Sequence, residues 1–164
     1  MLEKKEKAMI KKVTNKEIVN GSFVIPEGVT EIRNYAFYGC KSLEYIIIPE
    51  SVTEIGEFAF HKCTSLERIT IPEGVTEIGY CVFYGCTSLE SITIPESVTE
   101  IGESAFDGCE SLKSIIIPDS VTKIGDYAFH VCSSLKKVSL PKKVKLGYSV
   151  FDGCHPELEI EYRD

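Results

Sequence analysis

Apolar and polar positions recur along this chain with a period of 23 residues. Two columns of identical residues mark the period, the prolines Pro26, Pro49, Pro72, Pro95, Pro118 and Pro141 and the cysteines Cys40, Cys63, Cys86, Cys109 and Cys132. A fixed period of this length is typical of a stacked repeat protein, in which each unit buries its apolar face against its neighbours. The sequence therefore predicts one solenoid domain, mainly β.

One unit, Leu89–Cys109, shows the elements that the pattern predicts. Ile92–Ile94 alternate as a short parallel strand does. Pro95 ends the strand because proline has no N–H to donate to the hydrogen-bond ladder. Val98–Ile101 alternate again, which predicts a second, shorter strand. From Ser104 to Cys109 the apolar residues follow the three-residue step of a tight helical turn.

A glycine closes the second strand in most units, at Gly56, Gly79, Gly102, Gly125 and Gly147. Arg33 holds this position in the first full unit. Because a residue with a Cβ is accepted there, we do not expect the position to require a positive φ.

A phenylalanine column predicts the main contribution to the core, one ring per coil: Phe37, Phe60, Phe83, Phe106, Phe129 and Phe151. The last unit is shorter between Pro141 and Cys154, so we expect weaker packing around its phenylalanine.

The keyed positions of Leu89–Cys109, written L-x-x-I-x-I-P-x-x-V-T-x-I-G-x-x-A-F-x-x-C, resemble the BspA-like leucine-rich repeat. The resemblance extends roughly over Phe23 to Cys154. It implies a curved, right-handed solenoid with short parallel strands and helical turns. Members of that family are common in bacteria, often at the cell surface, where adhesion to host proteins is proposed. The resemblance therefore implies binding and no catalysis.

The two ends of a solenoid need caps, because terminal coils expose core and unpaired strand edges. We expect an N-terminal cap over residues 1–20, repeats over 21–154 and a capping strand over 155–164. Met9, Ile10 and Val13 share a helical face, which predicts a short helix over the first coil, and Thr14 with Glu17 has capping-box spacing. At the other end, Leu158, Ile160 and Tyr162 alternate with Glu159, Glu161 and Arg163, whose charges discourage edge-to-edge pairing.

Composition and charge restrict the classes of partner and bear on the cellular compartment. The net charge of −7 argues against nucleic acid, which requires clustered lysine and arginine, and favours a basic partner. No apolar run is long enough for a membrane span. The first 20 residues lack a signal-peptide core, so the chain as it stands is cytoplasmic, whereas a removed leader would make it secreted or surface-bound. Localisation is therefore left open.

The seven cysteines do not form a disulfide framework in this interpretation. Six of them occupy one repeat position, and parallel side chains on stacked strands rarely reach the disulfide dihedral. Cys81 is the odd member, and an odd count fits a reducing compartment. We predict buried free thiols.

Outward positions of the longer strand supply the candidate protein-binding face, on the expected concave surface. Its members are Tyr45, Ile47, Arg68, Thr70, Thr93, Ile116 and Lys137. Tyrosine and arginine are common anchors of protein interfaces. The alternative is that β-branched residues here only favour strand pairing.

Acidic residues also stack, after the prolines (Glu27, Glu50, Glu73, Glu96 and Asp119) and before the second-strand isoleucines (Glu31, Glu54, Glu77 and Glu100). They are interpreted as a solvated face or as a surface for a cationic partner. Nearby columns change to lysine from Lys113 onward, so weak end-to-end self-association is a further expectation.

No catalytic, cofactor-binding or metal-binding constellation is found in the sequence. The glycines follow the repeat and form no phosphate loop, and His61 and His130 are expected to point away from the cysteines two residues later. Two hypotheses remain: a non-catalytic protein–protein interaction module, or a structural spacer or self-assembling solenoid segment of a larger protein.

Overall fold

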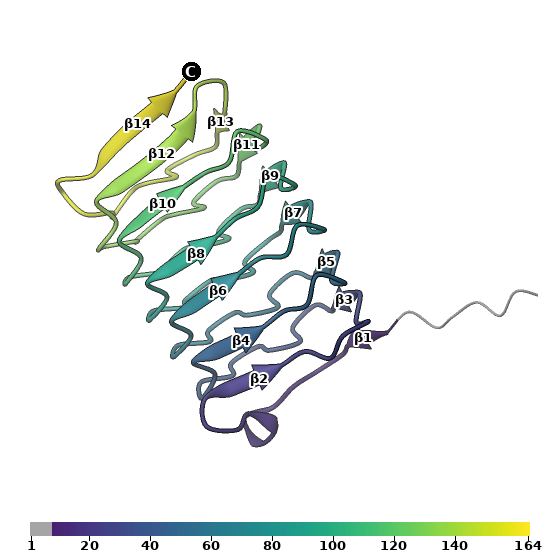
Figure 1. Ribbon diagram of the computed structural model, residues 1–164. Helices are drawn as coiled ribbons and strands as arrows, with labels where there is room; N and C mark the ends of the chain where they lie inside the picture. Colours follow the sequence, from purple (N-terminus) through teal and green to yellow (C-terminus); the bar gives the residue numbers. More distant parts are fainter. Residues whose placement is uncertain (1–7) are drawn as a thin grey trace, which may run out of the picture.

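A computed structural model describes residues 8–164 as a solenoid whose coils stack along one axis (Figure 1). The longer strands of successive coils lie side by side and form what we call the front face. They are β2 (Ser22–Val24), β4 (Tyr45–Ile47), β6 (Arg68–Thr70), β8 (Ser91–Thr93), β10 (Ser114–Ile116), β12 (Lys137–Pro141) and β14 (Glu159–Arg163). All strand pairs along this face are parallel, and they join β2, β4, β6 and β8 into one sheet and β10, β12 and β14 into a second. The prediction of a mainly β solenoid with short parallel strands is confirmed.

Two-residue strands form the opposite side, which we call the back face. They are β1 (Met9–Ile10), β3 (Glu31–Ile32), β5 (Glu54–Ile55), β7 (Glu77–Ile78), β9 (Glu100–Ile101), β11 (Lys123–Ile124) and β13 (Lys145–Leu146). They are shorter than the sequence pattern predicts: the strand expected over Val98–Ile101, for example, begins only at Glu100. Their isoleucines point into the core, and the preceding charged residues point outward.

The predicted helical turn of each unit is a series of separate turns. In 104–109, the N–H of Cys109 donates back to the carbonyl of Phe106 (3.1 Å), but the N–H of Phe106 itself donates to Ala128 of the next coil (2.8 Å). Ser104 has a left-handed backbone (φ 53°). This conformation interrupts a continuous helix, so alternate N–H groups are free to join neighbouring coils.

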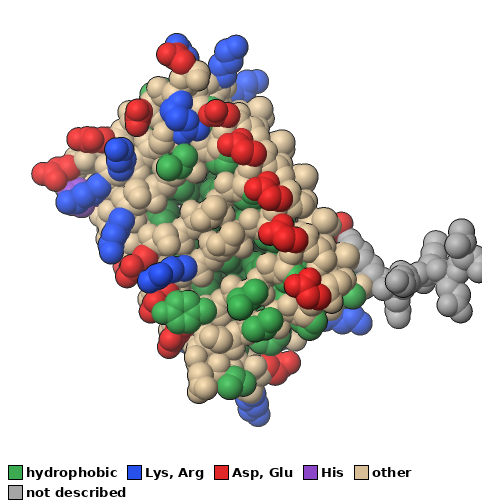
Figure 2. All heavy atoms as spheres, viewed as in Figure 1, with side chains coloured by type: hydrophobic (Ala, Val, Ile, Leu, Met, Phe, Trp, Pro, Cys, Tyr) green, Lys and Arg blue, Asp and Glu red, His purple; other side chains and the backbone are tan. Residues whose placement is uncertain are grey.

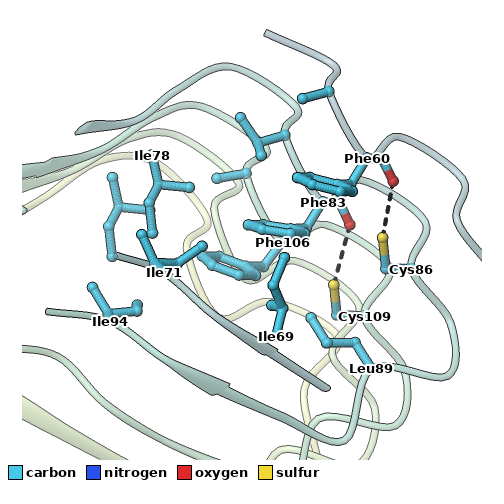
Figure 3. Close-up of a cluster of buried hydrophobic side chains, with 14 of the residues drawn as sticks. Phe60, Ile69, Ile71, Ile78, Phe83, Cys86, Leu89, Ile94, Phe106 and Cys109 are labelled. Carbon is cyan, nitrogen blue, oxygen red and sulfur yellow. Dashed lines mark hydrogen bonds between the residues drawn. The ribbon is translucent and has the colours of Figure 1, made fainter. Parts of the chain in front are cut away.

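The core is one stack of phenylalanine rings surrounded by aliphatic side chains and thiols (Figure 3). The rings of Phe37, Phe60, Phe83, Phe106 and Phe129 are fully buried. Neighbouring centroids from Phe37 to Phe129 lie 5.0–5.4 Å apart, with interplanar angles of 4–13°. Phe151 is partly buried and continues the stack at 5.7 Å. Each fully buried ring therefore contacts a ring on either side, whereas Phe151 contacts only Phe129.

The prediction of an N-terminal helix is wrong over the described residues. Met9 and Ile10 form β1, which pairs in parallel with β3, and Val13 is buried, with its N–H bonded to the Ala36 carbonyl at 2.7 Å. The free edge of β3 offers unpaired main-chain groups, and pairing with them outweighs the helical spacing of the apolar residues. Residues 1–7 of the expected cap lie outside the described residues.

The only helix in the described part of the chain is a 3-10 turn, η1 (Asn15–Glu17). The carboxylate of Glu17 accepts hydrogen bonds from the N–H (2.7 Å) and the hydroxyl (3.1 Å) of Thr14. Asn15 accepts from the N–H and hydroxyl of Ser42 (3.0 and 2.8 Å). These contacts fix the chain across the first coil.

At the C-terminal end, β14 pairs with β12 and Arg163 ties three coils together. Its guanidinium donates to the Ser139 hydroxyl (2.6 Å), to the Asp119 carboxylate (2.7 Å) and to the Ile117 carbonyl. Because β14 has no further coil beside it within residues 8–164, Ile160 and Tyr162 remain exposed.

Candidate protein-binding surface

The front face places exposed apolar side chains together at its N-terminal end. Val24 pairs with Ile47 across β2 and β4, and their exposed fractions are 61% and 62%. Tyr45 is 42% exposed and pairs with Arg68 on β6. Figure 2 shows apolar side chains gathered at this end of the face and mainly polar or main-chain surface beyond it. The candidate residues nearest this end are thus brought into contact.

A groove of about 360 Å³ opens between β4 and β6, and we call it the Tyr45 groove. Its outward lining comprises Tyr45, Ile47, Ile48, Arg68 and Thr70. It lies where strand pairing is reduced: β4 and β6 pair only through Tyr45 and Arg68, whereas three residue pairs join β6 to β8. A partly opened ladder leaves main-chain groups of the groove accessible for hydrogen bonds to a bound peptide.

Tyr45 is held in place by its neighbour. Its phenol donates a hydrogen bond to the Glu67 carboxylate at 2.7 Å. This bond, together with the negative charge of Glu67, raises the pKa of the Tyr45 phenol above its ordinary value. The hydrogen bond holds the ring in one orientation, as an interface anchor requires.

The remaining candidate residues lie further along the face. Thr93 pairs with Thr70 and lies one strand beyond the groove. Ile116 is 71% exposed but stands on β10, which is not hydrogen-bonded to β8. Lys137 pairs with Ser114 on the same separate sheet. The candidate set is consequently divided into an N-terminal group around Tyr45 and a C-terminal group around Ile116.

Sequence reasoning missed three contributors to the N-terminal group. Val24 occupies the same outward repeat position as Ile47. The sequence therefore indicated its exposure, although it was not included among the candidate binding residues. Ile48 faces inward in the repeat pattern and becomes partly exposed only because the ladder loosens beside it. Glu67 follows the leucine of its repeat, and only the structure shows its hydrogen bond to Tyr45.

The two edges of the front face carry different charged side chains. Acidic side chains follow one edge, at the carboxyl ends of the front strands, and lysine and arginine alternate with acidic residues along the other (Figure 2). The post-proline carboxylates are partly engaged, since Glu50 accepts from the N–H of Glu73 (3.3 Å) and Glu96 from that of Ser120 (3.4 Å). Lys113 pairs with Glu90 at 3.5 Å.

The histidines and outer aromatics form a separate cluster on the turns. His61 is stacked between Tyr38 (4.9 Å) and Tyr84 (4.7 Å), and both its ring nitrogens are inaccessible and without a hydrogen-bond partner. Burial and the neighbouring Lys62 lower the pKa of His61. His130 instead meets the Asp107 carboxylate at 3.1 Å. Neither histidine approaches a cysteine ligand set, and residues 8–164 bring no three metal-ligating side chains together.

Within residues 8–164, no helix has the length and apolarity to cross a bilayer.

Comparison with known proteins places this architecture in a family. The model of the BspA type leucine rich repeat region matches residues 15–129 and 58–162, with six copies. A leucine-rich repeat protein of Bacteroides ovatus has a similar crystal structure, with 38% identity and a TM-score of 0.83 over 98% of this chain. This chain spans only 44% of that protein's length. Among functionally curated proteins, none matches.

Two further solved structures have the same fold. The leucine-rich repeat protein of T. pallidum is 34% identical, with a TM-score of 0.72 over 84% of this chain and 78% of its own. A leucine-rich cell surface protein of Faecalibacterium prausnitzii is 27% identical, with a TM-score of 0.54 over 87% of this chain and 60% of its own. The repeat spacing, the stacked coils and these relatives agree, and the chain belongs to the BspA-type leucine-rich repeat family.

Proposed function

We propose that this chain is a non-catalytic protein-binding module that holds a protein or peptide partner on its front face. The anchor is the Tyr45 groove, where a tyrosine, an arginine and two isoleucines surround a hollow of about 360 Å³. Tyrosine and arginine are enriched among residues that dominate binding energy. Exposed Val24 and Ile47 extend the apolar surface beside it, which is the observation that carries the proposal.

One relative supports a setting for the partner at the cell surface. The F. prausnitzii structure is described as a leucine-rich cell surface protein, which supports presentation of this front face to extracellular or host proteins. The partner lies across the strands, with apolar side chains on Tyr45 and Ile47. Its charge on the side of the post-proline column is basic, because that column is acidic.

Affinity capture from cell lysate and from extracellular matrix, followed by mass spectrometry, tests the proposal. The immobilised chain is compared with Tyr45→Ala/Arg68→Ala, and the matched control Tyr148→Ala/Lys145→Ala removes an exposed tyrosine and a cation from the C-terminal coil. We expect the control to retain the same proteins as the unmodified chain and the Tyr45 variant to lose them, at equal melting temperature. Undiminished capture by the Tyr45 variant would rule out this face.

The alternative function is a structural spacer or self-assembling segment. It is favoured by the change of charge along the back face, where Glu100 is followed by Lys123 and Lys145 in register. Recovery of only the chain itself in the capture experiment, with an oligomer that dissociates in salt, supports this alternative.

A further inference from the structure

The back face carries an interruption that the front-face function does not use. In regular coils the residue after each short strand donates its N–H to the preceding coil, as Gly56 does to Ile32 (2.7 Å) and Gly102 to Ile78 (2.7 Å). Between β5 and β7, within the described residues, no hydrogen bond joins Gly79 to Ile55, and the two strands belong to separate sheets. One junction of the back-face ladder is open.

A second pair of main-chain groups is open at the same junction. Thr53 donates its N–H to the Thr30 carbonyl (2.9 Å), and Thr99 to Thr76 (2.9 Å), but the equivalent bond from Thr76 to Thr53 is missing from residues 8–164. The hydroxyls follow the same rule, since Thr53 and Thr99 bond to the preceding carbonyl (3.4 and 3.3 Å) and Thr76 does not. The carbonyls of Thr53 and Ile55 are thus left as unused acceptors.

The glycine column shows that the coils stand apart here. A Cβ built on Gly102 or Gly125 would lie 2.8 or 2.6 Å from the main chain of the preceding coil. At Gly79 the nearest atom is 3.9 Å away and belongs to the side chain of Glu77 in the same strand. The backbone that crowds the other glycines has therefore receded at this junction.

The separation creates a groove of about 420 Å³, which we call the β5–β7 groove. Ile55 contributes an apolar surface to it: this side chain is partly exposed, whereas Ile32, Ile78 and Ile101 in the same column are buried. The rim carries carboxylates, Glu54 and Glu57 on one coil and Glu77 on the next. Among residues 8–164, the side chains that line the groove include no lysine or arginine.

We propose that the β5–β7 groove docks an arginine side chain from a basic segment of a partner protein. A guanidinium has five N–H donors and no acceptor, and it is more weakly hydrated than an ammonium group. The groove offers the matching set: two unused carbonyls and a carboxylate rim above an apolar surface. The arginine stem packs on Ile55, and the planar head bonds to Glu57, Glu77 and the carbonyls.

The other half of the back face does not offer this site. Around β11 and β13 the ladder is closed, since Gly147 donates to Ile124 at 2.8 Å. The hollow there is smaller, about 280 Å³, and Lys123 and Lys145 line it together with Glu100, Glu103 and Asp126. Lys123 is already paired with Glu100 at 2.7 Å. A basic segment is therefore attracted more strongly to the N-terminal half, where the charged side chains of the groove are all acidic, than to the C-terminal half, where lysines offset the carboxylates.

Fluorescence anisotropy with labelled hexa-arginine and hexa-lysine peptides tests the proposal at low and moderate salt. The unmodified chain is expected to bind hexa-arginine about fivefold more tightly than hexa-lysine, because only guanidinium bonds in a bidentate manner. Glu57→Gln/Glu77→Gln should weaken hexa-arginine binding about tenfold and remove the preference for arginine. The control Glu110→Gln/Glu161→Gln removes two exposed carboxylates that line neither the β5–β7 groove nor the Tyr45 groove, and it should change affinity less than about twofold.

A second measurement locates the peptide without any substitution. In amide NMR spectra, the N–H signals of Thr76 and Gly79 should shift on addition of hexa-arginine, while that of Gly125, in a closed part of the ladder, should not. Equal weakening by the two double variants, equal affinity for both peptides, or unmoved Thr76 and Gly79 signals would each overturn the arginine site. These outcomes leave the front-face proposal untouched, since neither variant alters the Tyr45 groove.

Discussion

The thiol of Cys86 donates a hydrogen bond to the main-chain carbonyl of Phe60, one coil earlier, over 3.1 Å (Figure 3). The same carbonyl also accepts the N–H of Cys63 (3.1 Å), so the thiol uses its second lone pair. Equivalent bonds join Cys109 to Phe83 at 3.3 Å and recur along the column. The repeated cysteine is therefore a small apolar residue that satisfies a buried acceptor between coils.

The first prediction concerns thiol reactivity. All seven cysteines are free thiols, and burial raises the pKa of Cys86 to about 12. Since the thiolate is the reactive form, native protein at pH near 8 should resist a thiol-specific reagent for hours, apart from the partly exposed Cys154. Titration in denaturant should count seven thiols. Cys154→Ser serves as the control, and fast labelling of that variant would contradict the buried column.

The second prediction concerns the phenylalanine stack. Phe83→Ala removes a fully buried ring that contacts rings on both sides, and it should lower the free energy of unfolding by about 3–5 kcal/mol. Phe151→Ala should cost less, because this ring is partly exposed and stacks on Phe129 alone. Urea titrations of the two variants measure the difference. Equal losses would mean that the terminal coil is as tightly packed as the centre.

The third prediction tests the open junction through the glycine column. Gly125→Ala places a methyl group 2.6 Å from the Glu103 nitrogen and should cost about 1–3 kcal/mol through overpacking. Gly79→Ala meets nothing closer than 3.9 Å, so it should be neutral or stabilise by about 0.4–1 kcal/mol through the unfolded chain. Both residues have negative φ, so backbone strain does not separate them. Similar destabilisation of the two variants would argue that β5 and β7 are closed in solution.

The fourth prediction concerns acid sensitivity. The pKa of His61 is lowered in the folded state, chiefly by burial between Tyr38 and Tyr84, so the unfolded chain takes up its proton first as pH falls. Stability from this group is fully present above about pH 6.5, the unfolded value, and decreases below it. Thermal melts from neutral to acidic pH should show a slope that His61→Phe reduces. His155→Gln, outside the stack, should keep it, and an unchanged slope in His61→Phe would exclude His61 as the cause.

The period of 23 residues predicted the stacked coils, the strand positions and the phenylalanine column because each unit repeats one apolar skeleton. Arg33 correctly indicated that the glycine column does not need positive φ. The reason for these glycines, close approach of the preceding coil, was visible only in the structure. Tyr35, Phe58 and Ser104 have a left-handed backbone although none of them is glycine, so the sequence did not indicate this conformation. Hydrogen bonds from their N–H groups to the next coil stabilise it.

The N-terminal segment shows why spacing can mislead. Met9, Ile10 and Val13 fit one face of a helix, yet Met9 and Ile10 extend the back face as β1. A helical pattern in so short a segment is a weak preference, and an adjacent strand edge supplies main-chain bonds that a single turn cannot. Pairing with β3, and not the helical spacing within the segment, determined the conformation of Met9 and Ile10.

The sequence by itself determined that this protein stacks short strands into a solenoid, because each repeat can bury its apolar residues only against the neighbouring repeats. It also named Tyr45 and Arg68 as neighbours on adjacent coils. Only the tertiary structure decided where the ladders open: beside Tyr45 and between β8 and β10 on the front face, and between β5 and β7 on the back. Thr76 and Gly79 match the repeat as well as their equivalents do, because the distance between two coils depends on the packing of many residues at once.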